Sequence, residues 1–344
     1  MLKKILQYYP FNLAAVKITT FGSGLINQTW YIEEAGSSYI LQKINHTIFK
    51  SPGDIASNIK LTGEYLSAHY PHYLFVTPVN TINGDEMVYI EKEGYFRLFP
   101  FVKDSHTINV VSNPAQAFEA AQQFGRFTKL LSGFDANRLK ITLPHFHNLS
   151  LRYRQFEEAL EKGNKERIKE SANTIKLIHQ FKNIVTTRET ILANSAFKKR
   201  VTHHDTKISN VLFNEADKGL CVIDLDTVMP GYFISDVGDM LRTYLSPVSE
   251  EEKDFSRIEI RDEYYNAIKD GYLGEMAGEL TAAEKEHFFY AGKFMIYMQA
   301  LRFLTDHLNN DIYYGAKYEG HNFTRANNQL VLLQRYIEKE KQLS

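Results

Sequence analysis

The sequence predicts an α+β fold with two lobes, an N-terminal lobe built on an antiparallel sheet with one helix and a larger, mainly helical lobe. Strand patterns rich in β-forming residues dominate the chain up to about residue 103. Longer stretches with helical periodicity follow, and a short pair of strand patterns interrupts them over 211–226. The 344 residues are enough for two such lobes. We therefore expect lobes at 1–103 and 104–344.

The N-terminal lobe is expected to contain one helix over 53–69, with Ile55 and Ile59 on its apolar face. Asn83-Gly84 is typical of a hairpin turn. Pro100-Phe101-Val102 is the expected hinge. The strands are expected at Lys17–Phe21, Thr29–Glu33, Ser38–Ile44, Phe75–Val79, Met87–Ile90 and Tyr95–Phe99.

The C-terminal lobe is expected to be built from long amphipathic helices, which bury one face each. Their periodicity predicts helices over 114–131, 251–272, 282–308 and 323–341, with two or three more within 149–197. The strand patterns Val211–Phe213 and Leu220–Leu225 form the expected hairpin of this lobe.

Composition excludes several classes of protein. Lys+Arg total 40 and Asp+Glu 41, so the net charge of −1 excludes a strongly basic nucleic-acid binder. The single cysteine excludes an intrachain disulfide and a Cys-rich metal site. There is no clean signal peptide and no apolar run of about 18 residues. We expect a cytoplasmic protein without nucleic-acid or membrane partners, and the oligomeric state stays open.

The segment 200–243 carries the pattern with the clearest chemical meaning. If the predicted hairpin is centred on Asp217, Asn210 and Asp224 lie opposite each other on paired strands. An amide oxygen and a carboxylate at that separation can share a hard cation such as Mg²⁺. Asp205 lies five residues before Asn210 in a loop opened by His203, where it can accept a proton from a substrate hydroxyl. The alternative is that Asp205 and Asn210 only cap a turn and that Asp224 is a surface residue.

A glycine-containing loop between the first two strands can bring backbone N–H groups close to phosphates. Its pattern is G-x-G-x-x-N, and a plain hairpin loop is the alternative. The candidate nucleotide-binding residues of this loop are Gly22, Ser23, Gly24 and Asn27.

Lys43, on the third strand, is the candidate cation for the phosphates of ATP. Gln42 and Lys43 point to opposite faces of the strand, and sequence alone leaves open which of them faces the nucleotide. A solvated strand lysine is the alternative. Asn58 and Glu64 are both possible partners from the following helix.

The arrangement His203-x-Asp205-x4-Asn210-x13-Asp224 resembles the catalytic loop and metal-binding aspartate of the kinase fold. The chain resembles the aminoglycoside phosphotransferase/choline kinase superfamily, whose members have a protein-kinase-like fold and phosphorylate small molecules. The absence of D-F-G and A-P-E segments argues against a protein kinase. Within the superfamily the chain most resembles the N-acetylhexosamine 1-kinase group. The segments that carry the resemblance are Gly22–Asn27, Leu41–Asn45, Pro144–Asn148, His203–Lys207, Ile223–Gly231 and Arg302–Asp306.

The resemblance implies ATP-dependent phosphorylation of the anomeric hydroxyl of GlcNAc or GalNAc with Mg²⁺. It implies that Asp205 is the base, that Asn210 and Asp224 hold the metal, and that the glycine loop covers ATP. Adenine would lie near the hinge, at Phe101. The resemblance also implies supporting roles for three further residues around the catalytic loop and metal site, His203, Asp226 and Asp236.

Arg302 and Asp306 are four residues apart on a predicted helix, so they share a face and can bracket the hydroxyls of a sugar. A simple intrahelical ion pair is the alternative. Tyr314, which follows Tyr313, can pack on a sugar ring or in the core. His145 and His147 are interpreted as loop residues that form hydrogen bonds.

Two other functions compete with a sugar kinase. One is a kinase of another small hydroxyl compound, such as choline, ethanolamine, an amino alcohol or an aminoglycoside. The near balance of charges over 287–325 favours a neutral acceptor over these cations. The other is a catalytically inactive, kinase-like binding module. Loss of Asp205, Asn210 or Asp224 would indicate it, and all three are present.

Overall fold

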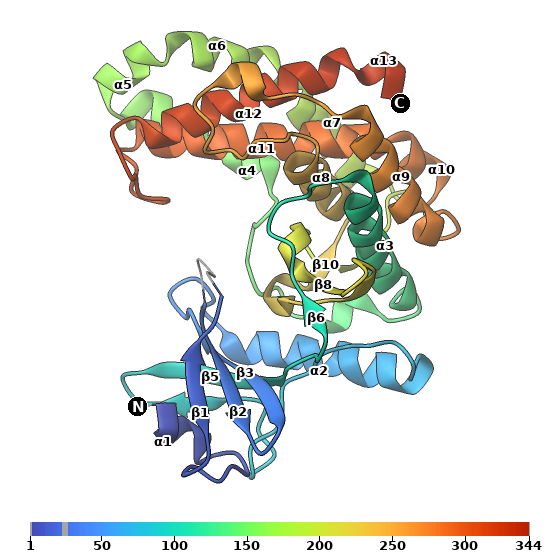
Figure 1. The fold of residues 1–344 in the computed structure, drawn as a ribbon. Helices are drawn as coiled ribbons and strands as arrows, with labels where there is room; N and C mark the ends of the chain where they lie inside the picture. The colour runs from blue at the N-terminus through green and yellow to red at the C-terminus, as the bar shows by residue number, and fades with distance from the viewer. Residues whose placement is uncertain (1, 23–26, 344) are drawn as a thin grey trace.

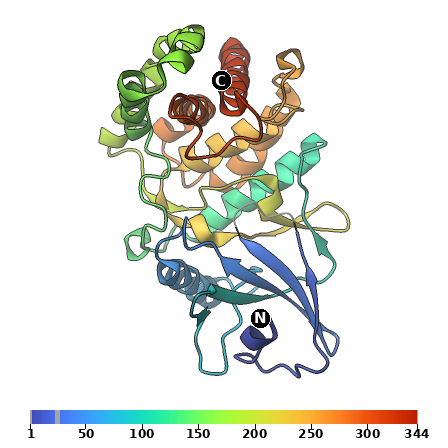
Figure 2. The same ribbon diagram turned by 90° about the vertical axis from the view of Figure 1, so that its left-hand side faces the viewer.

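The computed structural model of the chain describes residues 2–22 and 27–343. It has two lobes that meet along the helix α2 (Pro52–His69) (Figures 1 and 2). The smaller lobe holds a five-stranded antiparallel sheet in the order β1-β2-β3-β5-β4. Its strands are β1 (Lys17–Thr20), β2 (Gln28–Glu34), β3 (Ser37–Ile44), β4 (Val88–Ile90) and β5 (Gly94–Pro100).

The sequence located five of these strands and the helix α2 within one or two residues. The expected strand Phe75–Val79 is wrong, because this segment belongs to no ladder and forms only one backbone hydrogen bond to the sheet, from Val79 N–H to the Leu98 carbonyl. Asn83-Gly84 lies in a turn outside the sheet. The short N-terminal helix α1 (Leu2–Leu6) was not predicted, and its residues Ile5 and Leu6 pack into the core of this lobe.

The larger lobe is helical, as predicted. Its helices are α3 (Pro114–Leu130), α4 (Leu149–Lys162), α5 (Lys165–Glu170), α6 (Ala172–Gln180), α7 (Asn183–Ala193), α8 (Phe233–Tyr244), α9 (Asp262–Met276), α10 (Ala282–Glu286), α11 (Phe288–Leu308), α12 (His321–Glu338) and α13 (Glu340–Leu343). The helix expected over 251–272 begins only at Asp262, where Asp262 and Glu263 fall in the first turn and suit the positive end of the helix.

Short strands lie beside the boundary between the lobes, with α3 and α8 on their far side (Figure 1). They are β6 (Ser105–His106), β7 (Arg200–Thr202), β8 (Val211–Asn214), β9 (Gly219–Val222) and β10 (Met229–Gly231). β6 pairs with β8, β8 with β9, and β7 with β10. The candidate site residues from 203 to 226 are presented between these strands.

Two hydrophobic cores hold the molecule together. The smaller one lies between α1 and one face of the sheet and includes Leu41, Phe96 and Leu98. The larger one fills the helical lobe and extends across the boundary to Ile44 on β3 and to Ile55 and Ile59 on α2. The apolar face of α2 therefore packs with the larger lobe, although α2 belongs to the smaller lobe in chain order.

Candidate active site

The loop from His203 to Asn210 follows β7, and two aspartates of α8 hold it in place. The backbone N–H groups of His203 and His204 donate to the carboxylate of Asp236, at 3.0 and 2.7 Å. The N–H of Thr206 donates to Asp239, at 2.9 Å. Burial raises the pKa of Asp236 to about 7, against the opposing effect of the two N–H donors. These contacts hold the backbone of three loop residues, His203, His204 and Thr206, against α8.

Asp205 lies at the tip of this loop and keeps its carboxylate half-buried. The side-chain amide of Asn210 donates both to the Asp205 carbonyl (2.9 Å) and to its carboxylate (3.1 Å). The ammonium group of Lys207 lies 3.1 Å from the same carboxylate oxygen. Burial opposes the charge of Lys207, but the carboxylates of Asp205 and Asp224 outweigh it and raise the pKa of the lysine. Two donors from the loop itself therefore orient one carboxylate.

The expected pairing of Asn210 with Asp224 is wrong by one residue. Val211 pairs with Val222, and the N–H of Ile223 donates to the Asn210 carbonyl at 2.8 Å, so Asn210 lies opposite Ile223. The cause is the position of the turn, which is centred on Ala216 and not on Asp217, because the N–H of Asn214 donates to the Lys218 carbonyl. That turn alone would place Asn210 opposite Val222, and a bulge between Leu212 and Phe213 shifts the register by one residue, to Ile223.

Asp224 follows the end of β9 in the left-handed region, with φ of 59°. The residue as a whole is exposed, yet removal of water from around its carboxyl group raises the pKa of that group. The negative charges of Asp226 and Asp205 raise it further. A site that brings several carboxylates together favours a cation between them and the incoming phosphates.

The contacts of Asn210 leave room for a metal ligand. Its amide nitrogen is used by Asp205, so its side-chain oxygen is left for a cation. Within 2–22 and 27–343, no group of three or more His, Cys, Asp or Glu side chains is placed to hold a metal by itself. Asn210 and Asp224 fit Mg²⁺ as two oxygen ligands, because Mg²⁺ is commonly held by one or two side chains together with phosphates and water.

Asp226 points to the sheet of the smaller lobe. It pairs with Arg97 of β5 at 2.6 Å, and both side chains are almost fully buried. Arg97 also donates to the side-chain oxygen of Gln42 at 2.9 Å, and Asn27 donates to Asp226 at 2.9 Å. The amide oxygen of Asn27 accepts the backbone N–H of Asn45. The two lobes are thus joined by a buried ion pair at the end of the glycine loop.

The assignment of Lys43 to the nucleotide does not agree with this arrangement. Gln42 is paired with Arg97 and Lys43 with Phe96 across β3 and β5, and directly paired residues face the same side of a sheet. Lys43 therefore lies on the side of the smaller core, 3.4 Å from Glu93 and 5.6 Å from the ring centroid of Phe96. The cation on the side of the catalytic loop is Arg97, which sequence reasoning missed. The sequence feature that could have identified Arg97 is its charge, which is the only one within the otherwise apolar strand Tyr95–Phe99.

Neither proposed helical partner pairs with this cation. The side chain of Asn58 is fully buried and bonds the backbone of Lys140 and Val228 in the larger lobe, at 2.8 and 2.9 Å. Glu64 is exposed on α2. In the described part of the chain the carboxylate that meets Arg97 comes from Asp226, not from α2.

The glycine loop begins at Gly22, which has φ of +72°, a conformation that suits glycine. Ser23 and Gly24 lie outside the described residues. The rings of Phe21 and Tyr31 lie 6.3 and 5.2 Å from the ring of Phe101 at the hinge. These three aromatic rings form a partly exposed surface between the loop and the hinge, of the kind on which a planar base can pack.

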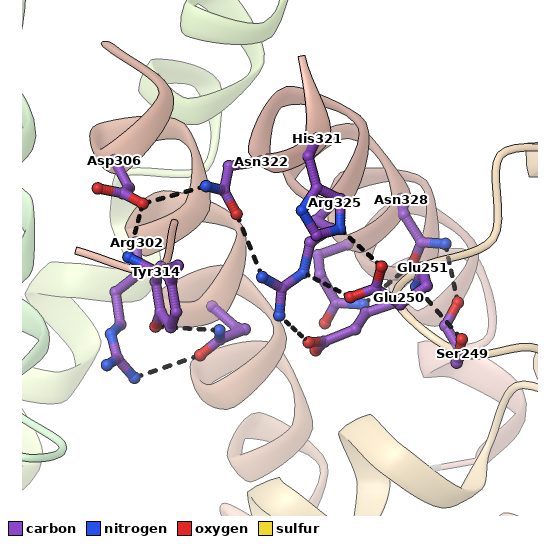
Figure 3. A network of polar contacts seen from close by, with 12 residues as sticks. Ser249, Glu250, Glu251, Arg302, Asp306, Tyr314, His321, Asn322, Arg325 and Asn328 are labelled. Carbon is purple, nitrogen blue, oxygen red and sulfur yellow. Dashed lines mark hydrogen bonds and ion pairs between the residues drawn. The ribbon is translucent and has the colours of Figure 1, made fainter. Parts of the chain in front are cut away.

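On the helical side, Arg302 and Asp306 do not act as a pair (Figure 3). Both oxygens of Asp306 accept backbone N–H groups, from Tyr313 at 2.7 Å and Tyr314 at 2.9 Å, and Asn322 donates to it as well. The expectation that Asp306 brackets a sugar is not supported, because its carboxylate is buried and used to hold the following loop. Arg302 instead bonds Gln299 and lies 5.3 Å from the ring centroid of Tyr314.

A chain of polar contacts continues from this loop back to the catalytic loop, and Figure 3 shows its first part, from Asn322 through Arg325 to Glu250. Asn322 accepts from Arg325, and Arg325 pairs with Glu250. Glu250 also pairs with Arg242 at 2.8 Å, and Arg242 pairs with Asp239. Asp239 in turn accepts the backbone N–H of Thr206 in the catalytic loop. The position of Tyr314 is therefore tied through charged groups to the loop that carries Asp205.

Lys207 is a second residue that sequence reasoning missed. It follows Asp205 by two positions, so the motif itself contained the signal. The motif alone assigns Lys207 no role, because its contact to Asp205 depends on the conformation of the loop.

The family profile described as "phosphotransferase enzyme family", APH, matches residues 17–284, which include every catalytic-loop residue described above. The chain belongs to this family. It is therefore a phosphotransferase of small molecules, and the predicted two-lobe, protein-kinase-like fold is confirmed by its structural relatives. No helix of the described residues is both long and apolar enough to cross a bilayer.

Three solved structures illustrate the likeness. A microcompartment-associated aminopropanol kinase is 15% identical, with a TM-score of 0.68 over 100% of this chain and 98% of its own. An amicoumacin kinase in complex with AMP-PNP and Ca²⁺ is 18% identical, with a TM-score of 0.66 over 97% of this chain and 92% of its own. Choline kinase from Cryptosporidium parvum is 14% identical, with a TM-score of 0.58 over 99% of this chain and 97% of its own. At these identities the likeness establishes the fold.

Proposed function

We propose that this APH-family phosphotransferase is an ATP-dependent kinase that uses Asp205 to activate a hydroxyl group of a small acceptor. The observation that carries the proposal is the environment of Asp205. Asn210 and Lys207 both contact its carboxylate at 3.1 Å. The loop that carries it is held by hydrogen bonds from its backbone N–H groups to Asp236 and Asp239. A carboxylate that is held in place but still partly open to solvent suits proton transfer to or from a bound substrate.

The reaction follows from these positions. As the acceptor oxygen forms its bond to the γ-phosphorus, the bond from that phosphorus to the β,γ-bridging oxygen breaks and ADP leaves. Asp205 takes the proton of the hydroxyl, and Lys207 lies beside it where the charge of the phosphoryl group develops. Asn210 and Asp224 would hold Mg²⁺, which screens the charge of the phosphates when it is bound.

The nucleotide is proposed to lie between the glycine loop and the hinge. Phe21, Tyr31 and Phe101 offer ring surfaces for adenine. Arg97, anchored by Asp226, supplies positive charge on the side of the catalytic loop. Lys43 has no part in this proposal, because it lies on the other face of the sheet.

N-acetylhexosamine, phosphorylated on its anomeric hydroxyl, is the first acceptor to consider. The sequence resemblance names it, and Arg302 with Tyr313 and Tyr314 offers hydrogen-bond donors and aromatic faces for a sugar ring. Amino alcohols, choline and aminoglycosides are the second candidates, because solved relatives include kinases of aminopropanol and choline.

The test is a screen of ATP consumption across N-acetylhexosamines, free sugars, aminopropanol, ethanolamine, choline and aminoglycosides, with Mg²⁺ present. The proposed kinase should form ADP in proportion to a phosphorylated acceptor identified by mass spectrometry. Turnover with amines alone would reject the sugar acceptor. Absence of acceptor-dependent ADP formation with every compound would reject the proposed kinase activity on these acceptor classes.

A further inference from the structure

Three arginines around the loop of His145 and His147 have no acidic partner. They are Arg152 on α4, Arg188 on α7 and Arg302 on α11, and no carboxylate within the described residues forms an ion pair with any of them. Other partly or fully buried arginines of the molecule do pair with acids: Arg97 with Asp226, Arg200 with Glu284, Arg242 with Asp239 and Arg325 with Glu250. Arg261 and Arg335 also lack an acidic partner, but their guanidinium groups donate to backbone carbonyls. Arg188 differs from both, because its Nε and Nη1 have no partner among the described residues.

Arg188 is the most unusual of the three, because its side chain is deeply buried. The residue is 7% exposed, and its Nε and Nη1 atoms are buried with no hydrogen-bond partner among the described residues. Its guanidinium lies between two rings, 5.3 Å from the centroid of Tyr232 and 5.4 Å from that of Phe294. Ring faces attract a cation, but they leave the N–H edges of the guanidinium unpaired. A buried cation in this state is costly unless an anion meets it.

His147 connects Arg188 to the catalytic loop. Its ring lies 5.4 Å from the ring of His204, which directly precedes Asp205, and 6.5 Å from the ring of Phe294. Its Nδ1 atom is buried and has no partner in the described part of the chain. The interpretation of His147 as a loop hydrogen-bonding residue is therefore not supported at this atom.

The positive charges act together on His147. Burial lowers the pKa of its imidazole well below the usual range, the neighbouring His204 acts in the same direction, and the charges of Arg302 and Arg188 lower it further. The imidazole is therefore neutral at pH 7, and the positive field around it comes from the arginines. Arg152 belongs to the same field, because Arg302 also lowers its pKa after the effect of burial.

Arg302 on α11 is the other arginine whose charge acts on His147. It bonds only neutral partners, Gln299 and the hydroxyl of Tyr313, both at 3.3 Å. Figure 3 shows its guanidinium directed away from Asp306, while Arg325 in the same view contacts Glu250 and Glu251. Two guanidinium groups, each with free N–H edges, match the geometry of a carboxylate or phosphate.

We propose that the acceptor carries an oxyanionic group, a carboxylate or a phosphate, which Arg188 and Arg302 bind while Asp205 receives the hydroxyl proton. This inference rests on the proposed kinase function and narrows its acceptor to an acidic derivative of an N-acetylhexosamine. A cationic acceptor would meet three uncompensated positive charges, and a neutral sugar would leave Arg188 without a counter-ion.

The first experiment compares acceptors that share the hexosamine ring and differ in charge. They are GlcNAc, its C6 carboxylate analogue N-acetylglucosaminuronic acid, GlcNAc 6-phosphate and glucosamine. We expect kcat/KM for one of the two anions to exceed that for GlcNAc by about tenfold or more, since hydrogen bonds between charged groups are about twice as strong as neutral ones. The carboxylate and phosphate compounds distinguish the two sources of the oxyanion.

The second experiment uses variants that remove charge but keep hydrogen-bonding capacity. Arg188→Gln and Arg302→Gln should each lower kcat/KM for the preferred anion by about tenfold or more, and by more than they lower kcat/KM for GlcNAc, with little effect on KM for ATP. Arg154→Gln is the matched control, because Arg154 is exposed on the same helix as Arg152. Arg188→Gln should also leave the melting temperature unchanged or raise it, because it removes an unpaired buried cation.

The outcomes separate this inference from the proposed function. Efficient turnover of GlcNAc with no gain from either anion would overturn the inference and leave the kinase in place. A fall in melting temperature in Arg188→Gln, with equal losses for neutral and anionic acceptors, would show that Arg188 is structural and would also overturn it. Turnover confined to amines would overturn both the acidic acceptor and the sugar acceptor.

Discussion

The carboxylate of Asp205 is the single group whose removal should separate phosphoryl transfer from nucleotide binding. Asp205→Ala is expected to lower kcat by about 10²- to 10⁴-fold, the range for loss of a general base. KM for ATP should change little, because the residue faces the acceptor. Asp270→Ala, an exposed aspartate on α9, is the control for expression and folding. An Asp205→Ala enzyme with nearly full activity would contradict the assignment of the base.

Arg97 and Lys43 lie on opposite faces of the same sheet, and this difference can be tested directly. Arg97→Lys keeps the charge but cannot reach Asp226 and Gln42 together, as the guanidinium does. We expect it to raise KM for ATP severalfold and to lower the free energy of unfolding by about 1–3 kcal/mol. Lys43→Met should have little effect on either quantity. The reverse result, with ATP binding lost only in Lys43→Met, would restore the lysine to the nucleotide site.

Sequence analysis predicted which kinds of residue form the site better than it predicted the face of the sheet on which a strand residue lies. The motif located Asp205, Asn210 and Asp224 in one region, because their spacing is local. The strand pattern pointed to Lys43 and not to Arg97, because the face on which a strand residue lies depends on how β3 is paired with β5, and this pairing joins segments more than 50 residues apart.

His204 gives the active-site loop a specific dependence of stability on pH. Burial lowers its pKa from 6.5 to about 4. The folded state therefore favours the neutral imidazole, and the stabilisation present above pH 6.5 is lost as the pH falls toward 4. Between pH 7.5 and 5.0 this single group should cost about 2 kcal/mol of unfolding free energy.

Urea unfolding at these two pH values measures this contribution. In His204→Asn, which tolerates the left-handed backbone at this position, the loss between pH 7.5 and 5.0 should be smaller by about that amount than in the parent protein. His72→Asn, at an exposed position, should leave the loss unchanged. An equal loss in the parent and in His204→Asn would show that the imidazole is not held neutral in the folded state.

Among the elements of the fold, the hairpin of β8 and β9 has strands that the sequence predicts and a register that it does not. A symmetric hairpin centred on Asp217 places Asn210 against Asp224. In the structure the turn is centred on Ala216, and a bulge then shifts the register by one residue, so that Asn210 lies opposite Ile223. Asp224 reaches the site through its left-handed conformation. A bulge of this kind leaves no reliable trace in hydrophobic alternation, whereas the existence of the two strands does.

The ribbon of β7 and β10 supports the catalytic loop by close packing. A Cβ atom on Gly231 would lie 2.4 Å from Nε2 of His204 and 2.9 Å from the hydroxyl of Thr202. Gly231→Ala should therefore displace His204, lower kcat, and destabilise the fold by about 1–3 kcal/mol. Gly274→Ala is the matched control, since nothing lies within 4 Å of its Cβ position and the change within α9 should stabilise the fold by about 1 kcal/mol. Normal activity in Gly231→Ala would mean that the loop tolerates the displacement.

In the molecule as a whole, the two lobes are separate in chain order, but their hydrophobic packing crosses the boundary between them. The sequence divides the chain near residue 103, where strand patterns give way to helical ones. The larger core nevertheless includes Ile55 and Ile59 of α2, so this helix packs with the lobe that follows it in sequence. Amphipathic periodicity identifies the buried face of a helix but not the element that covers it.

Asn58 is the polar counterpart of that packing, and it links α2 to the larger lobe. Its fully buried amide donates to the carbonyls of Lys140 and Val228, and its oxygen accepts the N–H of Lys140 at 2.8 Å. Asn58→Ala leaves these backbone groups buried without partners. The free energy of unfolding should fall by about 2–4 kcal/mol, and amide exchange in α2 should accelerate more than in α12, which lies far from the contact. Glu64→Ala, exposed on the same helix, should change the unfolding free energy by less than about 0.5 kcal/mol. If α2 kept its protection in Asn58→Ala, apolar packing alone would hold the helix against the larger lobe.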